Sequence, residues 1–149
     1  MRQKYVPAIA IVAFLFVSPI VQAQCKAFVK SNLARLESYI HDGSYQAVMM
    51  SEGEEAEVFK TIFAGQQYRL LVCIEDVLPN VEVIVTDIRR NILFDSRKVE
   101  KTNKNENAKI WDFKSDVSQQ IKVTIRIPKS EKSGEVVFGC AGVLFGLKE

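Results

Sequence analysis

The sequence predicts a mainly β protein: an antiparallel β-sandwich, jelly-roll-like, with about eight short strands and one N-terminal α-helix. Three observations lead to this fold class. Apolar and polar residues alternate over most of the chain, most clearly in residues 121–127, where Ile121, Val123 and Ile125 alternate with polar side chains. Turn signals separate these segments at short intervals. A good helical period occurs in a single segment, residues 26–40.

The predicted helix spans residues 26–40. Its apolar positions share one helix face, at spacings of four, three and four: Val29, Leu33, Leu36 and Ile40. An Asp-Gly turn signal follows the segment. Because the rest of the chain alternates, we expect this helix to pack across a face or an end of the sandwich.

The strand segments lie between turn signals and charged stretches. The expected strands are residues 44–50, 56–63, 68–74, 81–86, 92–94, 109–113, 121–127 and 135–145. Residues 97–109 are almost entirely polar, so we expect them to form a surface loop. The last strand contains Gly139, Gly142 and Gly146, and glycines inside a strand indicate a bulge or the close approach of another backbone.

Residues 1–23 are predicted to be a cleavable secretory signal peptide. Arg2 and Lys4 give a positive start, an apolar run follows, and Ala23 is the small residue that a signal peptidase needs before the cut. We expect the remainder, residues 24–149, to be a single domain that is secreted or periplasmic.

Two other interpretations of the leader compete with this one. A transmembrane anchor needs about 20 apolar residues, whereas the apolar core from Ala8 to Val17 is shorter and Pro19 interrupts its extension. A lipoprotein signal needs a small residue before the modified cysteine, but Gln24 precedes Cys25. We therefore expect no lipidation and no stable membrane insertion once the leader is cleaved.

The charge of the mature domain argues against nucleic-acid binding. The whole chain has 20 basic and 18 acidic residues, a formal net charge of +2. Removing Arg2 and Lys4 with the leader leaves 18 basic against 18 acidic residues. A nucleic-acid-binding domain normally keeps a basic patch, so we expect no nucleic-acid partner.

Export makes a disulfide plausible among the three cysteines, because thiols oxidise outside the cytoplasm. We favour Cys25 with Cys140, since this bridge would tie the two ends of the domain together and stabilise it by about 4 kcal/mol. Cys73 lies in a strongly apolar strand and suits a buried free thiol. A Cys73–Cys140 bridge, or three reduced cysteines, remain alternatives, because the sequence does not determine connectivity.

No set of residues in the sequence points to catalysis, a metal or a cofactor. His41 is the only histidine, and we interpret it as a helix-end residue rather than a catalytic base. Nucleophile-elbow, C-x-x-C and phosphate-loop motifs are absent from the sequence. The acidic residues of 52–57 lack the spacing of a calcium loop and are interpreted as a solvated turn. We therefore assign no catalytic, cofactor-binding or metal-binding residue.

Aromatic residues offer a candidate binding face for a sugar or a peptide. It would consist of Tyr45, Tyr68 and Trp111, with Phe113 on the same side of its strand as Trp111. Aromatic residues at strand spacing more often belong to the core, and we favour that alternative for them.

The segment Phe63-Ala64-Gly65-Gln66-Gln67-Tyr68-Arg69 resembles the bacterial pre-peptidase C-terminal domain, in which a Gly-Gln turn leads into a strand that opens with tyrosine. The similarity covers roughly residues 56–145. It implies a small secreted β-sandwich of a kind often appended to exported proteases. Arg89-Arg90 stands where that family usually has a glycine turn, and its usual acidic residues are missing at 78–80, so the resemblance carries over no calcium site.

These observations predict an exported, non-enzymatic binding or accessory module, and they do not identify its ligand: a protein, a peptide, a glycan or Ca²⁺ would fit. The alternative is a structural or envelope-assembly subunit that acts through protein–protein contacts at its sheet edges or at the 97–109 loop. A hydrolase that uses two carboxylates is a third hypothesis, since such a pair needs only spatial proximity.

Overall fold

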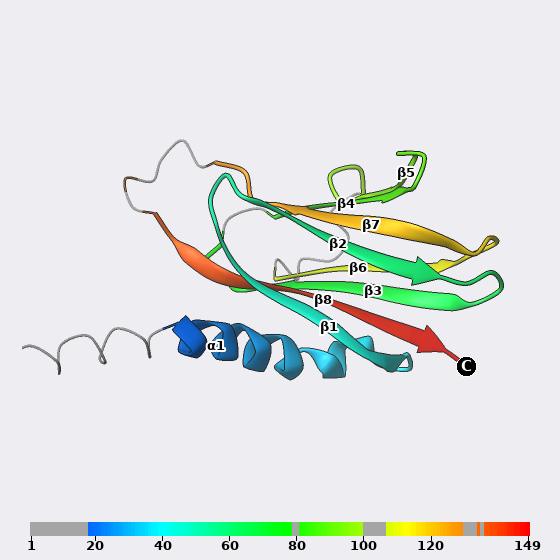
Figure 1. Cartoon of the computed structure of the whole chain (residues 1–149), viewed down its shortest axis with the longest axis horizontal. Coiled ribbons are helices and arrows are strands. Elements are labelled where there is room, and N and C mark those ends of the chain that lie inside the picture. The colour runs from blue at the N-terminus through cyan, green and yellow to red at the C-terminus, as the bar shows by residue number, and fades with distance from the viewer. Residues whose placement is uncertain (1–17, 79–80, 100–106, 130–133, 135) are drawn as a thin grey trace, which may run out of the picture.

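The computed structural model describes residues 18–78, 81–99, 107–129, 134 and 136–149. Within them, two four-stranded sheets stack face to face and a helix lies along the outside of one sheet (Figure 1). The predicted mainly β sandwich is therefore confirmed. The elements are α1 (Ser18–Ser31), the 3-10 helix η2 (Leu33–Leu36), β1 (Ile40–Ser51), β2 (Glu55–Ile62), β3 (Gln67–Ile74), β4 (Glu82–Asp87), β5 (Ile92–Asp95), β6 (Ala108–Lys114), β7 (Gln119–Arg126) and β8 (Phe138–Lys148).

The strand pairing is nested. The first strand pairs with the last, β2 with β7, β3 with β6 and β4 with β5, all antiparallel. A chain paired in this way is one long antiparallel ribbon folded over on itself, which is the arrangement of a jelly roll. The β3–β8 and β4–β7 pairs then complete sheet A (β1-β8-β3-β6) and sheet B (β2-β7-β4-β5).

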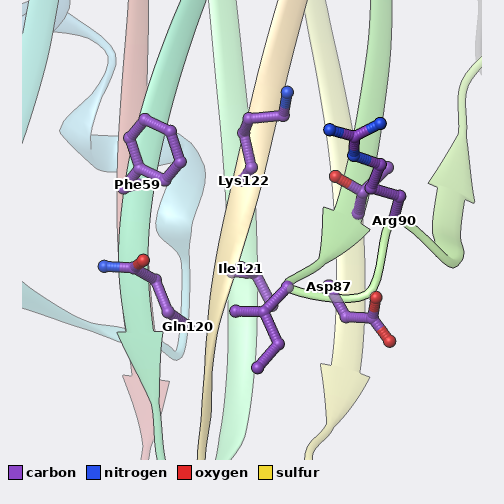
Figure 2. Close-up of a pocket in the computed structure, with 8 residues that line it drawn as sticks. Phe59, Asp87, Arg90, Gln120, Ile121 and Lys122 are labelled. Carbon is purple, nitrogen blue, oxygen red and sulfur yellow. The ribbon is translucent and has the colours of Figure 1, made fainter.

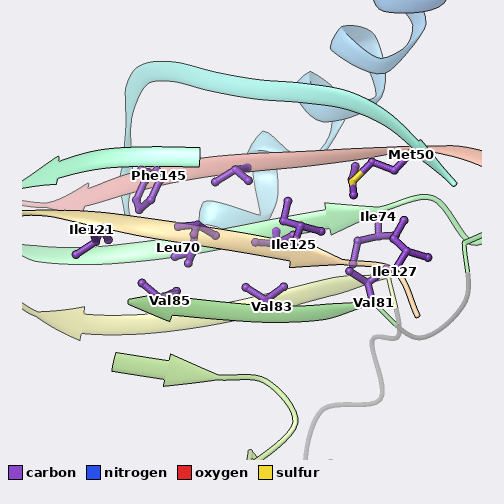
Figure 3. Packing of buried hydrophobic residues seen from close by; sticks show 14 of the residues in the cluster. Met50, Leu70, Ile74, Val81, Val83, Val85, Ile121, Ile125, Ile127 and Phe145 are labelled. Atoms are coloured by element: carbon purple, nitrogen blue, oxygen red, sulfur yellow. The ribbon is translucent and has the colours of Figure 1, made fainter. Parts of the chain in front are cut away.

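The main core lies between the two sheets. Ile121, Val123 and Ile125 of β7 point inward and are at most 1 % exposed, as their alternation predicted. Figure 3 shows Ile121 and Ile125 facing side chains of sheet A such as Leu70 and Phe145. Burying one such side chain stabilises the fold by roughly 1.5–3 kcal/mol, so this layer holds the sandwich together.

An ion pair joins the two sheets at one edge of the sandwich. Lys60, on edge strand β2, points inward and pairs with Asp42 of β1, and its Nζ lies 5.4 Å from the centre of the Phe145 ring. Burial raises the pKa of Asp42, but hydrogen bonds from Lys60 and Ser44 outweigh this effect and hold the pKa below its usual value. An inward-pointing charge also protects an edge strand from pairing with another chain.

The helix differs from the prediction at both ends. We expected residues 26–40, but α1 begins at Ser18 and ends at Ser31. The side chain of Asn32 donates a hydrogen bond to the Phe28 carbonyl (2.9 Å), and its backbone N–H donates to Val29 (3.1 Å). These local bonds replace the helical ones and end the helix, as Asn side chains often do. The apolar spacing in the sequence continues past the end of α1, because Leu36 of η2 is buried in the same cluster as Val29.

Helix α1 and η2 cover the outer face of sheet A. A second apolar cluster fills this layer: Val29, Leu36, Tyr39, Leu71, Cys73 and Leu144. Side chains of the covering segment, rather than another backbone, approach two glycines of β8: a Cβ at Gly142 would overlap Val29, and one at Gly146 would lie 2.6 Å from Tyr39 Cβ. Glycine in the strand therefore lets the covering segment reach the sheet.

An arginine of sheet A holds the end of this covering segment. Arg69 of β3 donates two hydrogen bonds of 2.7 Å to the Asp112 carboxylate and one of 2.7 Å to Glu37. Its guanidinium also lies 4.6 Å from the centre of the Tyr39 ring. Hydrogen bonding to Asp112, followed by that to Glu37, raises the pKa of Arg69. A bidentate arginine of this kind fixes geometry better than a single ion pair does.

A disulfide joins Cys25 of α1 to Cys140 of β8, the pair that we favoured from the sequence. The two Cα atoms are 5.1 Å apart and 115 residues apart in the chain. Cys73 is a buried free thiol on the helix-covered face, and burial raises its pKa to about 11. Disulfides persist in oxidising compartments, so this bridge is typical of a secreted or periplasmic protein.

Most of the predicted leader, residues 1–17, lies outside the described residues, as do residues 100–106 of the predicted polar loop. Cleavage after Ala23 would remove the start of α1 and leave Gln24–Ser31, with Cys25 as the second residue of the mature chain. Neither helix in the described part of the chain has the length and apolar character needed to cross a membrane.

Candidate functional site

The outer face of sheet B differs from that of sheet A because no helix among the described residues packs on it (Figure 1). The register places Lys122 of β7 between Phe59 of β2 and Thr86 of β4. Alternation turns these three side chains away from the core, because their neighbours Val58, Ile121 and Val85 face inward. Phe59 is 58 % exposed although it lies well inside its strand.

Ion pairs between neighbouring strands occupy much of this face. Arg126 of β7 donates to the Glu55 carboxylate at 2.8 and 2.9 Å, and Lys122 Nζ lies 2.6 Å from Glu57. These glutamates belong to the acidic run that we interpreted as a solvated turn, but the structure places both in β2. All four side chains are substantially exposed, so each pair contributes little to stability.

A shallow pocket of about 190 Å³ opens beside Phe59, between β2, β7 and the turn from β4 to β5 (Figure 2). Its lining combines apolar surface with cationic and amide groups: Phe59, Thr86, Asp87, Ile88, Arg90, Gln120, Ile121 and Lys122. The exposed ring of Phe59 beside cationic and amide groups makes this pocket the candidate interaction site.

The β4–β5 turn that forms one wall is held by Asp87. Its carboxylate accepts hydrogen bonds from the backbone N–H groups of Arg89 and Asn91, both at 2.8 Å, and from the Asn91 side chain at 2.7 Å. The hydrogen bond from the Asn91 side chain is the main reason that the pKa of Asp87 is lowered. This turn presents Ile88, which is 69 % exposed, and Arg90, whose φ of 67° lies in the left-handed region.

The residues that line the pocket include one carboxylate and neither histidine nor cysteine. The pocket's one carboxylate, that of Asp87, is engaged by three N–H donors. His41 is not among its lining residues; it lies in β1, with Nε2 3.0 Å from the Ser44 carbonyl oxygen, and not at a helix end as we expected. Among the described residues, no group of three or more His, Cys, Asp or Glu side chains could hold a metal ion.

The candidate aromatic face does not form one surface. Tyr68 is 2 % exposed in the main core, and its hydroxyl accepts a hydrogen bond from the Phe63 N–H at 2.9 Å. Trp111 packs against the same core, stacked on Phe94 and Phe113. Tyr45 lies on the other side of sheet A, in the cluster beneath α1. The core alternative therefore describes these residues better.

Phe59, Ile88 and Arg90 were not among the binding residues predicted from the sequence, where Arg89-Arg90 stood out only as a departure from a glycine turn. A partial signal for Phe59 was present, because alternation places it on the opposite side of its strand from Val58, although it does not say which side faces the core. Ile88 and Arg90 had no such signal. Their proximity to Phe59 depends on the register of β4 against β7, which a single sequence does not reveal.

Comparisons with known proteins give no family for this chain. No family model matches it, so the resemblance to the pre-peptidase C-terminal domain finds no such support, and no curated protein sequence matches it significantly. Among solved structures, Aeromonas hydrophila PliG, a periplasmic inhibitor of g-type lysozyme, is similar with a TM-score of 0.48 and 8 % identity, over 75 % of this chain and 90 % of that one. Salmonella Typhimurium PliG, with the same description, gives a TM-score of 0.43 and 10 % identity, over 68 % and 86 %.

Proposed function

We propose that this chain is an exported, non-enzymatic binding module that holds a protein partner on the uncovered face of sheet B. The observation that carries the proposal is the pocket beside Phe59, where exposed apolar side chains lie among cationic and amide groups. Partially desolvated aromatic side chains with nearby arginines are frequent anchors of protein interfaces.

The contrast between the two sheets supports a role in binding. A sandwich that needed both outer faces covered for stability would bury them both, yet Phe59 and Ile88 remain more than half exposed. Charged ion pairs occupy the strands around them, so Phe59 and Ile88 expose apolar surface beside the pocket among charged groups. A partner that covers the pocket would gain from burying this surface.

The disulfide and the predicted leader support work outside the cytoplasm. The Cys25–Cys140 bridge is of the kind found mainly in oxidising compartments. The partner would therefore meet this module in the periplasm or outside the cell.

Site-specific photo-crosslinking in the native host tests the proposal. A photoreactive phenylalanine analogue replaces Phe59 in one variant and Phe138 in the control. The two positions match in residue type and exposure, 58 and 59 %, but Phe138 begins β8 in the other sheet. We expect a discrete crosslinked protein from position 59 and none from position 138.

Crosslinks from position 138 alone would indicate that the partner binds to sheet A instead of sheet B. No crosslink from either position, in cells that export and fold both variants, would contradict protein binding on sheet B.

A further inference from the structure

Arg90 occupies a backbone conformation that favours another residue. Its φ of 67° is in the left-handed region, where glycine fits without steric cost and asparagine is tolerated better than a long side chain. The chain instead carries an arginine here, the second of the pair Arg89-Arg90. Non-glycine residues held in such conformations concentrate at functional sites.

The guanidinium of Arg90 is also the available cation of the pocket. Arg90 forms no ion pair within the described part of the chain, whereas Lys122 is paired with Glu57 at 2.6 Å. In Figure 2, the Arg90 guanidinium and the Lys122 ammonium lie toward the same end of the pocket, and the Asp87 carboxylate points the opposite way. The Asp87 carboxylate is already occupied by hydrogen bonds from Arg89 and Asn91.

The charges around the pocket favour a single negative charge in the partner. Arg90 can bind one carboxylate with two parallel hydrogen bonds, a geometry that its planar guanidinium favours. A doubly charged phosphate would also meet the negative charges of Glu57 and Asp87, of which Asp87 lines the same pocket. Phe59 and Ile88 flank the pocket with apolar surface.

We infer that the pocket binds a segment of the partner protein in which a Glu or Asp side chain lies next to a large apolar side chain. The carboxylate pairs with Arg90, and the apolar side chain packs against Phe59 and Ile88. This inference rests on the proposed function, because it names the chemistry of the partner at that same surface. Arg90 then determines specificity, and Phe59 supplies apolar contact that does not depend on charge.

Fluorescence anisotropy with short labelled peptides tests the inference. Each probe contains a Leu-Glu pair, and its twins carry Gln or phosphoserine in place of Glu. We expect the wild-type domain to bind the Glu peptide about tenfold more tightly than the Gln twin, the effect of about one ion pair. The phosphoserine twin should bind no better than the Glu peptide.

Variants of the turn separate recognition from folding. Arg90→Gly should bind the Glu and Gln peptides equally, while its melting temperature stays the same or rises, because glycine suits the positive φ. Arg89→Gly removes the same charge from a neighbour that does not line the pocket and should keep the preference for Glu.

The possible failures are distinguishable. If the wild type binds Glu and Gln peptides equally and Phe59→Ala abolishes both, the inference about Arg90 is wrong but the proposed surface stands. Tighter binding of the phosphoserine twin, or loss of the Glu preference in Arg89→Gly, also overturns the inference. If no peptide binds, or if Phe59→Ala has no effect on binding, the inference fails together with the pocket as a docking site.

Discussion

The two outer faces of this sandwich are built in opposite ways. On sheet A, an apolar cluster that includes Val29 and Leu144 is sealed beneath α1, and Gly142 makes room for the helix. On sheet B, charged pairs cross the strands and Phe59 stays exposed. One face is thus buried for stability, whereas the other keeps apolar surface exposed to solvent. Substitutions on the two faces should therefore affect different measurements.

The largest effect should follow from cutting the link that holds α1 on sheet A. We expect Cys25→Ser/Cys140→Ala to lower the free energy of unfolding by about 4 kcal/mol, because the bridge closes a loop of 115 residues. Urea unfolding gives this value, and faster labelling of Cys73, which lies beneath the helix, reports undocking. Cys73→Ala keeps the bridge and is the control. A loss below about 1 kcal/mol in the double variant would show that packing alone holds the helix.

Filling the space at Gly142 should have the next largest effect. The added methyl group of Gly142→Ala would overlap Val29, so we expect a loss of about 2 kcal/mol as the helix shifts away from the sheet. Gly134→Ala meets no atom within 4 Å and should change stability by less than about 0.5 kcal/mol. Equal unfolding midpoints for the two variants would refute the close approach of α1.

The ion pair that joins the sheets at one edge should give a smaller, pH-dependent effect. We expect Asp42→Asn to cost about 1 kcal/mol at pH 7 by weakening the pair with Lys60. The pKa of Asp42 is lower in the folded protein than its ordinary 3.8, so the contribution is present above pH 4 and is lost as the pH falls through the folded value. Urea melts across this range should bring wild type and variant together in acid. If the free energies of unfolding of wild type and variant differed by the same amount down to the lowest pH, the effect would not come from ionisation of the Asp42 carboxylate.

The smallest effect should come from the ion pairs on the open face. Arg126→Ala removes the contact with Glu55, but both side chains are substantially exposed. We expect a change below about 0.5 kcal/mol in chemical denaturation, as for most exposed pairs. A loss above about 1.5 kcal/mol would mean that the face of sheet B is also built for stability.

Alternation predicted the strands well because it is a local property. The inward set of β7, with Ile121 and Val123, could be assigned from the sequence alone. The end of α1 could not, since the apolar period continues through η2 to Leu36 while Asn32 redirects the backbone. A local signal thus placed the element but not its boundary.

The candidate site required information that the sequence does not contain. Phe59 and Gln120 come together through the pairing of β2 with β7, and Ile88 joins them from a different turn. Alternation also leaves open which side of a strand faces the core, so Tyr68 could be proposed for a binding face although it is buried. Sheet register decides the first question, and the packing of the two sheets on each other decides the second.

The central claim is that the outer face of sheet A stabilises the fold and that of sheet B binds the partner. Two matched truncations test it most directly: Leu144→Ala on sheet A and Phe59→Ala on sheet B. Each variant is measured for urea unfolding and for crosslinking to the partner from a photoreactive residue at Ile88. We expect Leu144→Ala to lower the free energy of unfolding by about 3 kcal/mol and, while folded, to keep the crosslink. We expect Phe59→Ala to lower the free energy of unfolding by less than about 0.5 kcal/mol but to lose the crosslink. A large loss of stability in Phe59→Ala with an intact crosslink would contradict the account.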